Sequence, residues 1–248
     1  MRLAAAGLAS AGTSGEWRPD MDDAIQYASQ RHGVIAFAVR TPTRSWGWHS
    51  AETLPSASVL KAMLLVAYLD LPSVRGRALR PADRALLAPM IRRSDNACAG
   101  RVLGIVGPAH VHAVADRAGM RRFRLVTGIW GLSRIDAADQ ARYFFRIDAL
   151  TTPRHRAYAL HLLNTIVPSQ RWGIARVRPP GWRLYFKGGW GSGTGWVDHQ
   201  VALLTRGDER ISVAILTFHD GSHPYGEETL RGIALRLLSG LDSADAVS

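Results

Sequence analysis

Residues 58–70 read SVLKAMLLVAYLD, and this stretch decides the fold. Apolar side chains cover nearly every face of the helix that it predicts, which is typical of a helix buried within a domain. The first turn of that helix carries Ser58, and Lys61 follows three residues later on the same face. A chain of 248 residues is long enough to bury such a helix in a sizeable core.

Strand signals lie on both sides of this helix. Residues 34–39 are continuously apolar, and a Thr-Pro-Thr turn joins them to residues 45–49, so we expect the chain to open with two strands. Residues 81–166 form Ala-, Leu- and Arg-rich segments separated by turn signals, which predicts an all-helical middle. Three more strands and a closing helix are expected at residues 183–187, 201–204, 211–218 and 227–238.

The two chain ends are therefore expected to share one sheet. We predict an α/β fold, an α+β sandwich whose antiparallel sheet is built from both chain ends and flanked by helices, with an inserted all-helical lobe. Residues 18–55 and 167–245 would form the α/β lobe, and residues 56–166 the helical lobe. Clefts between lobes are common sites, so the functional site is expected between them.

Composition excludes several classes of protein. The formal net charge is +11, but the charges are dispersed without a run of five or six of one sign, and we expect no nucleic-acid partner. No run of about 18 apolar residues predicts a transmembrane helix. The single cysteine, Cys98, cannot form an intramolecular disulfide and is expected in the core. The histidines show no metal-ligand spacing, so neither a metal nor a cofactor is expected.

The N-terminus allows two interpretations. Residues 1–17 are Ala-rich, and Ala9-Ser10-Ala11 resembles a signal-peptidase site, so they predict either a remnant export signal or a disordered tail. The first interpretation places the protein in the periplasm, the cell wall or the medium, and the second in the cytoplasm. We expect a monomer.

Three short motifs follow one another along the chain: Ser58-Val59-Leu60-Lys61, Ser94-Asp95-Asn96 and Lys187-Gly188-Gly189. Each motif has a structural alternative, namely a helix serine with a snorkelling lysine, an ordinary helix cap and a hairpin turn. Their order favours a common catalytic site.

Lysine usage strengthens this interpretation. Of 31 basic residues only Lys61 and Lys187 are lysines, and both lie inside the motifs. A guanidinium stays protonated in proteins, whereas a desolvated amine can lose its proton and act as a base. The spacing lets Lys61 bring its amine to the Ser58 hydroxyl, which favours a serine nucleophile.

The third motif predicts substrate binding along a strand. Lys187 is expected to end a strand, and its ammonium could reach a substrate carboxylate. Gly188 and Gly189 let a backbone approach closely. Backbone N–H groups near Ser58 and Trp190 could form an oxyanion hole.

These motifs resemble the serine β-lactamases, especially class A, and the low-molecular-weight penicillin-binding D,D-peptidases, over roughly residues 20–240. The resemblance implies that Ser58 is the acylated nucleophile, Lys61 its general base and Ser94 a proton shuttle. It also implies that Asn96 contacts a substrate amide and that Lys187 anchors a substrate carboxylate.

The chain departs from class A enzymes in three places. Those enzymes activate the deacylating water with a glutamate on a long loop, but residues 120–135 contain no Glu or Asp. Gly188 stands where the family usually has a hydroxyl residue. Trp196 and Val197 lie near the usual position of a carboxylate-binding arginine.

Three functions share Ser58 as the reactive group. The first is a class A β-lactamase-related hydrolase that uses another group for deacylation. The second is a D-Ala-D-Ala carboxypeptidase acting on peptidoglycan stem peptides, and the third a protein that binds β-lactam or peptidoglycan without turnover. A basic structural or nucleic-acid protein is the alternative from an unrelated class, and it predicts salt-sensitive binding to DNA or RNA.

Overall fold

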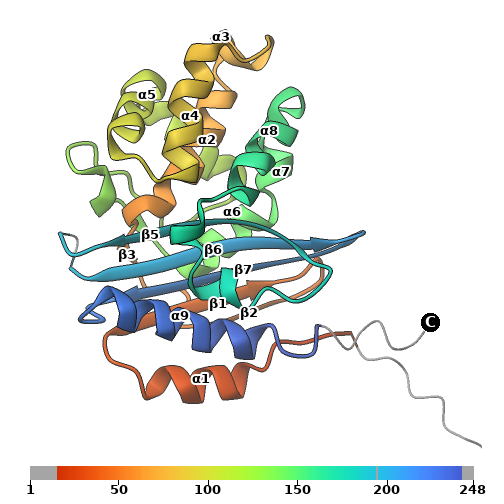
Figure 1. The fold of residues 1–248 in the computed structure, drawn as a ribbon. Helices are drawn as coiled ribbons and strands as arrows, with labels where there is room; N and C mark the ends of the chain where they lie inside the picture. Colours follow the sequence, from red (N-terminus) through yellow and green to blue (C-terminus); the bar gives the residue numbers. More distant parts are fainter. Residues whose placement is uncertain (1–15, 194, 242–248) are drawn as a thin grey trace, which may run out of the picture.

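The computed structural model describes residues 16–193 and 195–241, and its centre is a five-stranded sheet (Figure 1). The strands lie in the order β2-β1-β7-β6-β5, and every neighbouring pair is antiparallel. Their bounds are Val34–Arg40 (β1), Ser45–Trp48 (β2), Arg183–Gly191 (β5), Val197–Arg206 (β6) and Glu209–Phe218 (β7). The prediction of an antiparallel sheet with strands from both chain ends is confirmed.

Helices cover both faces of this sheet. Helices α1 (Met21–Ser29) and α9 (His223–Leu237) pack together on one face, and α6 (Ala137–Phe145) packs on β1 and β7 of the other (Figure 1). Beyond α6 lies a helical layer, whose members are α2 (Leu60–Leu69), α3 (Pro72–Arg75), α4 (Pro81–Arg92), α5 (Asn96–Ala118), α7 (Ile147–Leu150) and α8 (Pro153–Asn164).

Helix α2 is the centre of the helical layer, as its apolar sequence predicts. All ten of its residues are buried, and α4, α5 and α8 surround it. Short 3-10 helices connect the larger elements: η1 (Ala57–Val59), η2 (Trp130–Leu132), η3 (Pro168–Gln170) and η4 (Gly173–Arg176). Because η1 leads directly into α2, the first turn of the buried helix begins at the edge of the sheet.

Three expectations about individual elements were wrong. The chain does not open with two strands, because α1 precedes β1. Its inward face carries Ala24 and Ala28, which are buried, and Met21 and Ile25, which are half-buried. The middle of the chain is not wholly helical, because β4 (Arg134–Ile135) pairs with β3 (Leu54–Pro55). Strand β5 does not end at Lys187 but continues to Gly191, because β6 supplies paired partners as far as Val197.

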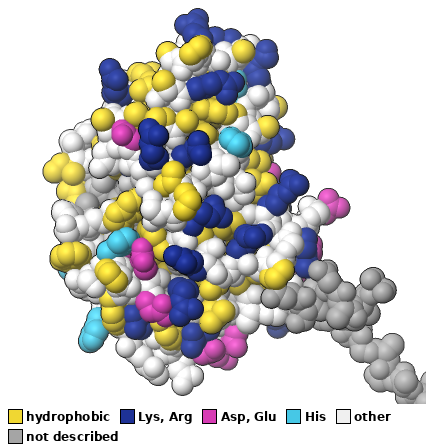
Figure 2. All heavy atoms as spheres, viewed as in Figure 1, with side chains coloured by type: hydrophobic (Ala, Val, Ile, Leu, Met, Phe, Trp, Pro, Cys, Tyr) yellow, Lys and Arg dark blue, Asp and Glu magenta, His cyan; other side chains and the backbone are white. Residues whose placement is uncertain are grey.

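The surface carries its positive charge on arginine. Both lysines are fully buried, so the exposed cationic side chains of the described residues are guanidinium groups. Figure 2 shows them spread over one face from the helical layer down to α9, with acidic and apolar side chains among them. Within residues 16–193 and 195–241, no helix combines the length and apolar character needed to cross a membrane. The possible export signal at Ala9-Ser10-Ala11 lies outside the described residues.

Candidate active site

The site begins at a backbone turn that presents Ser58. Ser56 N–H donates to Ser133 O at 2.6 Å, and Ala57, the first residue of η1, adopts a left-handed φ of 41°. Non-glycine residues rarely adopt this conformation, which costs about 1–2 kcal/mol. The strained turn places Ser58, which is 9% exposed, at the junction of the sheet and the helical layer.

Strand β5 packs directly against this turn. A Cβ atom at Gly189 would lie 2.9 Å from the backbone N atoms of both Ser58 and Val59, so only glycine permits the approach. The close contact explains why the sequence has glycine at this position of the third motif. It brings the edge strand of the sheet alongside the candidate nucleophile.

Lys61 is fully buried, and its amine meets four oxygen atoms. Nζ lies 2.8 Å from Ser58 Oγ, 3.0 Å from Ser94 Oγ and 2.7 Å from Asn96 Oδ1, and it also donates to Ser94 O. Ser94 O and Asn96 Oδ1 can only accept hydrogen bonds. A neutral amine can therefore donate its two N–H groups to them and keep its lone pair for a serine hydroxyl.

Burial lowers the pKa of Lys61 to about 7, and the nearby Asp95 carboxylate opposes this effect only in part. At neutral pH a large fraction of the amine is thus unprotonated. An amine with this pKa, within hydrogen-bond distance of a serine hydroxyl, is suited to general-base catalysis.

Lys187 extends the same network from β5. Its Nζ is fully buried and donates to Ser94 Oγ at 3.0 Å and to Gly188 O at 2.7 Å. Burial, reinforced by the charge of Lys61, lowers its pKa well below the usual range. Ser94 Oγ is therefore equidistant from the two amines, at 3.0 Å from each.

The second motif divides its residues between two roles. Asp95 is the N-cap of α5 and accepts a hydrogen bond from Cys98 N at 2.7 Å, so the capping alternative holds for this residue. The Cys98 N–H bond also lowers the pKa of the Asp95 carboxyl. Ser94, held at a φ of 58°, and Asn96 face Lys61 instead.

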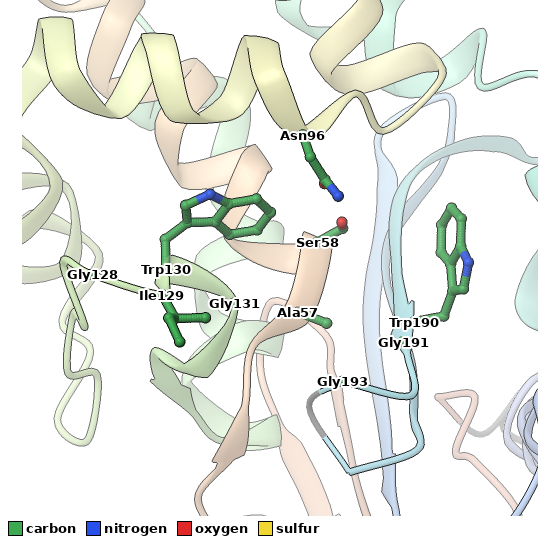
Figure 3. A pocket seen from close by; sticks show the side chains of 10 residues that line it. All are labelled: Ala57, Ser58, Asn96, Gly128, Ile129, Trp130, Gly131, Trp190, Gly191 and Gly193. Carbon is green, nitrogen blue, oxygen red and sulfur yellow. The ribbon is translucent and has the colours of Figure 1, made fainter.

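A cavity of about 340 Å³ opens beside Ser58. Figure 3 shows Trp130 and Trp190 on either side of the serine, with Asn96 above it. The described residues that line the cavity are Ala57, Ser58, Asn96, Gly128, Ile129, Trp130, Gly131, Trp190, Gly191 and Gly193. None of them has an ionisable side chain of the Asp, Glu, His, Lys or Arg type.

Trp130 is a site residue that was not predicted from the sequence. It belongs to the segment between α5 and α6, and its ring centroid lies 5.0 Å from Lys61 Nζ. Ser56 holds this segment beside the serine turn through two hydrogen bonds. Its N–H donates to Ser133 O, and its Oγ donates to Trp130 O at 3.4 Å. The tryptophan between Gly128 and Gly131 was the only signal available. The absence of Glu and Asp from residues 120–135 thus corresponds to an aromatic wall in the cavity.

His199 of β6 is fully buried beneath the site. Its Nε2 lies 2.8 Å from Pro55 O, and its Nδ1 lies 3.1 Å from Thr217 N and 2.9 Å from Asp198 O. Burial lowers its pKa to about 4. The imidazole thereby ties β6 and β7 to the residue that precedes the serine turn.

The structure brings the predicted residues together. Ser58, Lys61, Ser94, Asn96 and Lys187 are linked by direct contacts. Gly189 lies against the serine turn, and Trp190 lines the cavity. Gly188 faces the other side of β5, where a Cβ atom would lie 3.2 Å from the Trp172 ring.

Comparisons with known proteins identify a family for the chain. Residues 76–241 match the model of the beta-lactamase enzyme family, a segment that includes Ser94 and Lys187 but starts after Ser58 and Lys61. No curated protein has a sequence that matches the chain.

Solved structures with a similar fold include several β-lactamases. The β-lactamase from Sphaerobacter thermophilus DSM 20745 has a TM-score of 0.76 at 20% identity, covering 87% of this chain and 94% of its own. A class A representative from Bacteroides cellulosilyticus DSM 14838 has a TM-score of 0.75 at 13% identity, covering 91% and 99%. A β-lactamase from Xanthomonas campestris pv. campestris str. ATCC 33913 has a TM-score of 0.75 at 14% identity, covering 88% and 95%. At these identities the likeness shows the fold alone.

Proposed function

The chain belongs to the beta-lactamase enzyme family, and from this premise we propose that it is a serine hydrolase that β-lactams acylate at Ser58. One observation carries the proposal: the buried Lys61 amine, with a pKa of about 7, lies 2.8 Å from Ser58 Oγ at the wall of an open cavity. A helix serine with a snorkelling lysine would place the amine in solvent instead.

Acylation follows from these contacts. The neutral Lys61 amine takes the Ser58 proton while Oγ attacks the lactam carbonyl carbon. When the C–N bond breaks, the leaving nitrogen takes a proton from Ser94 Oγ, which regains one from the adjacent lysine. Backbone N–H groups of Ser58 and Trp190 are the proposed donors to the oxyanion. Asn96 is the proposed contact for the substrate amide.

Deacylation needs a base for water, and the cavity offers no carboxylate among its described lining residues. Lys61 returns to its neutral form once its proton has passed to the leaving nitrogen, so the same amine is the proposed base for the second step. A general base typically contributes about 10²–10⁴-fold, and a base shared by both steps is less well placed for water than a dedicated one. We therefore expect slow turnover.

The aromatic wall formed by Trp130 supports a second candidate. Without a carboxylate to activate water, the acyl-enzyme could persist, as it would in a penicillin-binding D-Ala-D-Ala peptidase or a protein that binds β-lactam or peptidoglycan without turnover. The peptidase predicts release of D-Ala from a peptide ending in D-Ala-D-Ala. No such release at high enzyme concentration would exclude it. Action outside the cytoplasm is part of the proposal for all these functions.

The deciding experiment is intact-mass spectrometry of the wild type and Ser58→Ala with a penicillin, while the β-lactam absorbance is followed in parallel. An adduct that requires Ser58 and decays as substrate is consumed supports a β-lactamase. A stable adduct supports the peptidase or the binding protein. No adduct in the wild type would refute the proposal that β-lactams acylate Ser58.

A further inference from the structure

The side of β5 that carries Gly188 and Trp190 is filled by aromatic rings. Because successive residues of a strand face opposite sides, these two residues point away from the side on which Gly189 meets the serine turn. The Trp172 ring lies against Gly188 and makes an edge contact with the Trp190 ring at 5.9 Å between centroids. A side chain at position 188 would place its Cβ 3.2 Å from the Trp172 ring, so the indole would have to shift by a few tenths of an ångström.

Trp190 is also held from behind by His223. The two rings are stacked at 5.9 Å with an interplanar angle of 20°. His223 lies between two carboxylates, with Nδ1 2.5 Å from Asp198 Oδ1 and Nε2 3.1 Å from Glu227 Oε1. Both ring nitrogens of His223 therefore already have a carboxyl partner, so neither is left to bind another anion. Its contacts instead fix the indole in the cavity wall.

Among the described residues, the cavity lining offers no exposed cation to a bound substrate. Its described lining residues carry no ionisable side chain of the basic or acidic type, and both lysines of the site are fully buried with their Nζ atoms already donating to oxygens. Burial opposes the charged form of each lysine, and neither side chain is exposed to the cavity as a cation that could pair with a carboxylate. Burying an unpaired carboxylate against indole rings would be costly.

From this geometry we infer that the site selects acyl donors without a carboxylate beside the scissile bond. The donor is an uncharged ester or amide whose apolar group packs against Trp130 and Trp190. This inference rests on the proposed acylation of Ser58 and narrows its substrate class. It assigns Trp190 a role in specificity, and His223 the role of a positioning residue behind it.

A pair of donors that differ only in this group provides the test: benzylpenicillin and its methyl ester. The rate of adduct formation at Ser58 is measured for each by intact mass. We expect the ester to acylate about tenfold faster than the acid at pH 7.5. A faster reaction of the acid would overturn the inference.

A charge added at the cavity mouth gives a matched control. Ile129 lines the cavity and is 63% exposed, whereas Ile105 is 52% exposed on α5 and does not line it. Ile129→Arg should lower the ester-to-acid rate ratio at least tenfold, and Ile105→Arg should leave it unchanged. Equal effects of the two variants would show that overall charge, not the cavity wall, sets the preference, and would overturn the inference.

The preference for donors without a carboxylate can be tested even if no donor acylates Ser58. Ser58→Ala keeps the cavity, and quenching of tryptophan fluorescence then gives the non-covalent Kd of each donor without any reaction. Tighter binding of the ester supports the inference even if neither donor acylates the wild type, in which case only the proposed function fails. Tighter binding of the acid overturns the inference.

Discussion

The pH dependence of acylation tests the role of Lys61 most directly. Burial lowers its pKa from the ordinary value of 10.5 to about 7, which corresponds to about 5 kcal/mol against the charged amine. The base is the neutral form, so the acylation rate should follow its fraction. That fraction falls from about 90% at pH 8 to about 1% at pH 5, a loss of about 90-fold.

The assay is stopped-flow acylation with a chromogenic cephalosporin, under single-turnover conditions from pH 5 to 9. The rate should rise about tenfold per pH unit below pH 7 and reach a plateau above pH 8. A rate still rising tenfold per unit at pH 9 would mean that the amine has an ordinary pKa, and a flat profile would mean that it is not the base. Either result refutes the reasoning. Lys61→Met, which keeps the apolar chain but lacks the amine, should acylate about 10²–10⁴-fold more slowly at pH 8.

Three further predictions concern the scaffold of the site. Gly189→Ala should reduce acylation at least 100-fold because its Cβ would meet backbone atoms at 2.9 Å, whereas Gly104→Ala, which faces open space, should keep full activity; equal activities would contradict the close-packing argument. His199→Gln should lower the free energy of unfolding by about 2–3 kcal/mol at pH 7.5 through loss of its buried hydrogen bonds. The pKa of His199 is about 4 in the folded state, so as pH falls below 6.5 the unfolded state takes up a proton before the folded state does. The free energy of unfolding of the wild type should therefore drop by up to about 3 kcal/mol by pH 4. Urea unfolding should show a smaller drop for His199→Gln, which lacks the imidazole. Burial and Asp220 raise the pKa of Asp198 to about 9, so unfolding releases a proton between about pH 4 and 9 and the stability of the wild type falls as pH rises. The Tm of Asp198→Asn, measured relative to that of the wild type, should therefore be higher at pH 8 than at pH 5. An equal Tm difference at both pH values would refute the raised pKa of Asp198.

The sequence predicts the sheet and the central helix well because their signals are local. Residues 58–70 are apolar on nearly every face, and the structure buries all ten residues of α2. Strand signals need only a few β-branched and apolar residues, which β1 and β7 supply. Helix α1 was missed although Met21, Ala24, Ile25 and Ala28 follow helical spacing, because the stripe is only two turns long and half of it is alanine.

The site, like the fold, was predictable only where its residues lie close together in the sequence. The three motifs were visible because each is short and contiguous, and the structure brings Ser58, Lys61, Ser94 and Lys187 into direct contact. Their catalytic roles stay predictions. The contact of Trp172 with Gly188 was not predictable, because it joins the connection after α8 to an edge strand and depends on the tertiary fold. The sequence showed that a hydroxyl was missing at position 188, but not that an indole ring takes its place.

The missing carboxylate and the low pKa of Lys61 have a common physical origin. A glutamate in the cavity would stabilise the protonated amine and raise its pKa, as Asp95 does weakly from outside. With aromatic residues in that place, burial dominates, and Lys61 becomes a base at neutral pH. The absence of a glutamate therefore has two effects. It leaves deacylation without a dedicated base for water, and it makes Lys61 a better base for acylation. Indole rings in place of charged side chains also disfavour a substrate carboxylate in the cavity. A charge introduced beside Trp130 should therefore change three properties together: the rate of acylation, the lifetime of the acyl-enzyme and the choice of acyl donor.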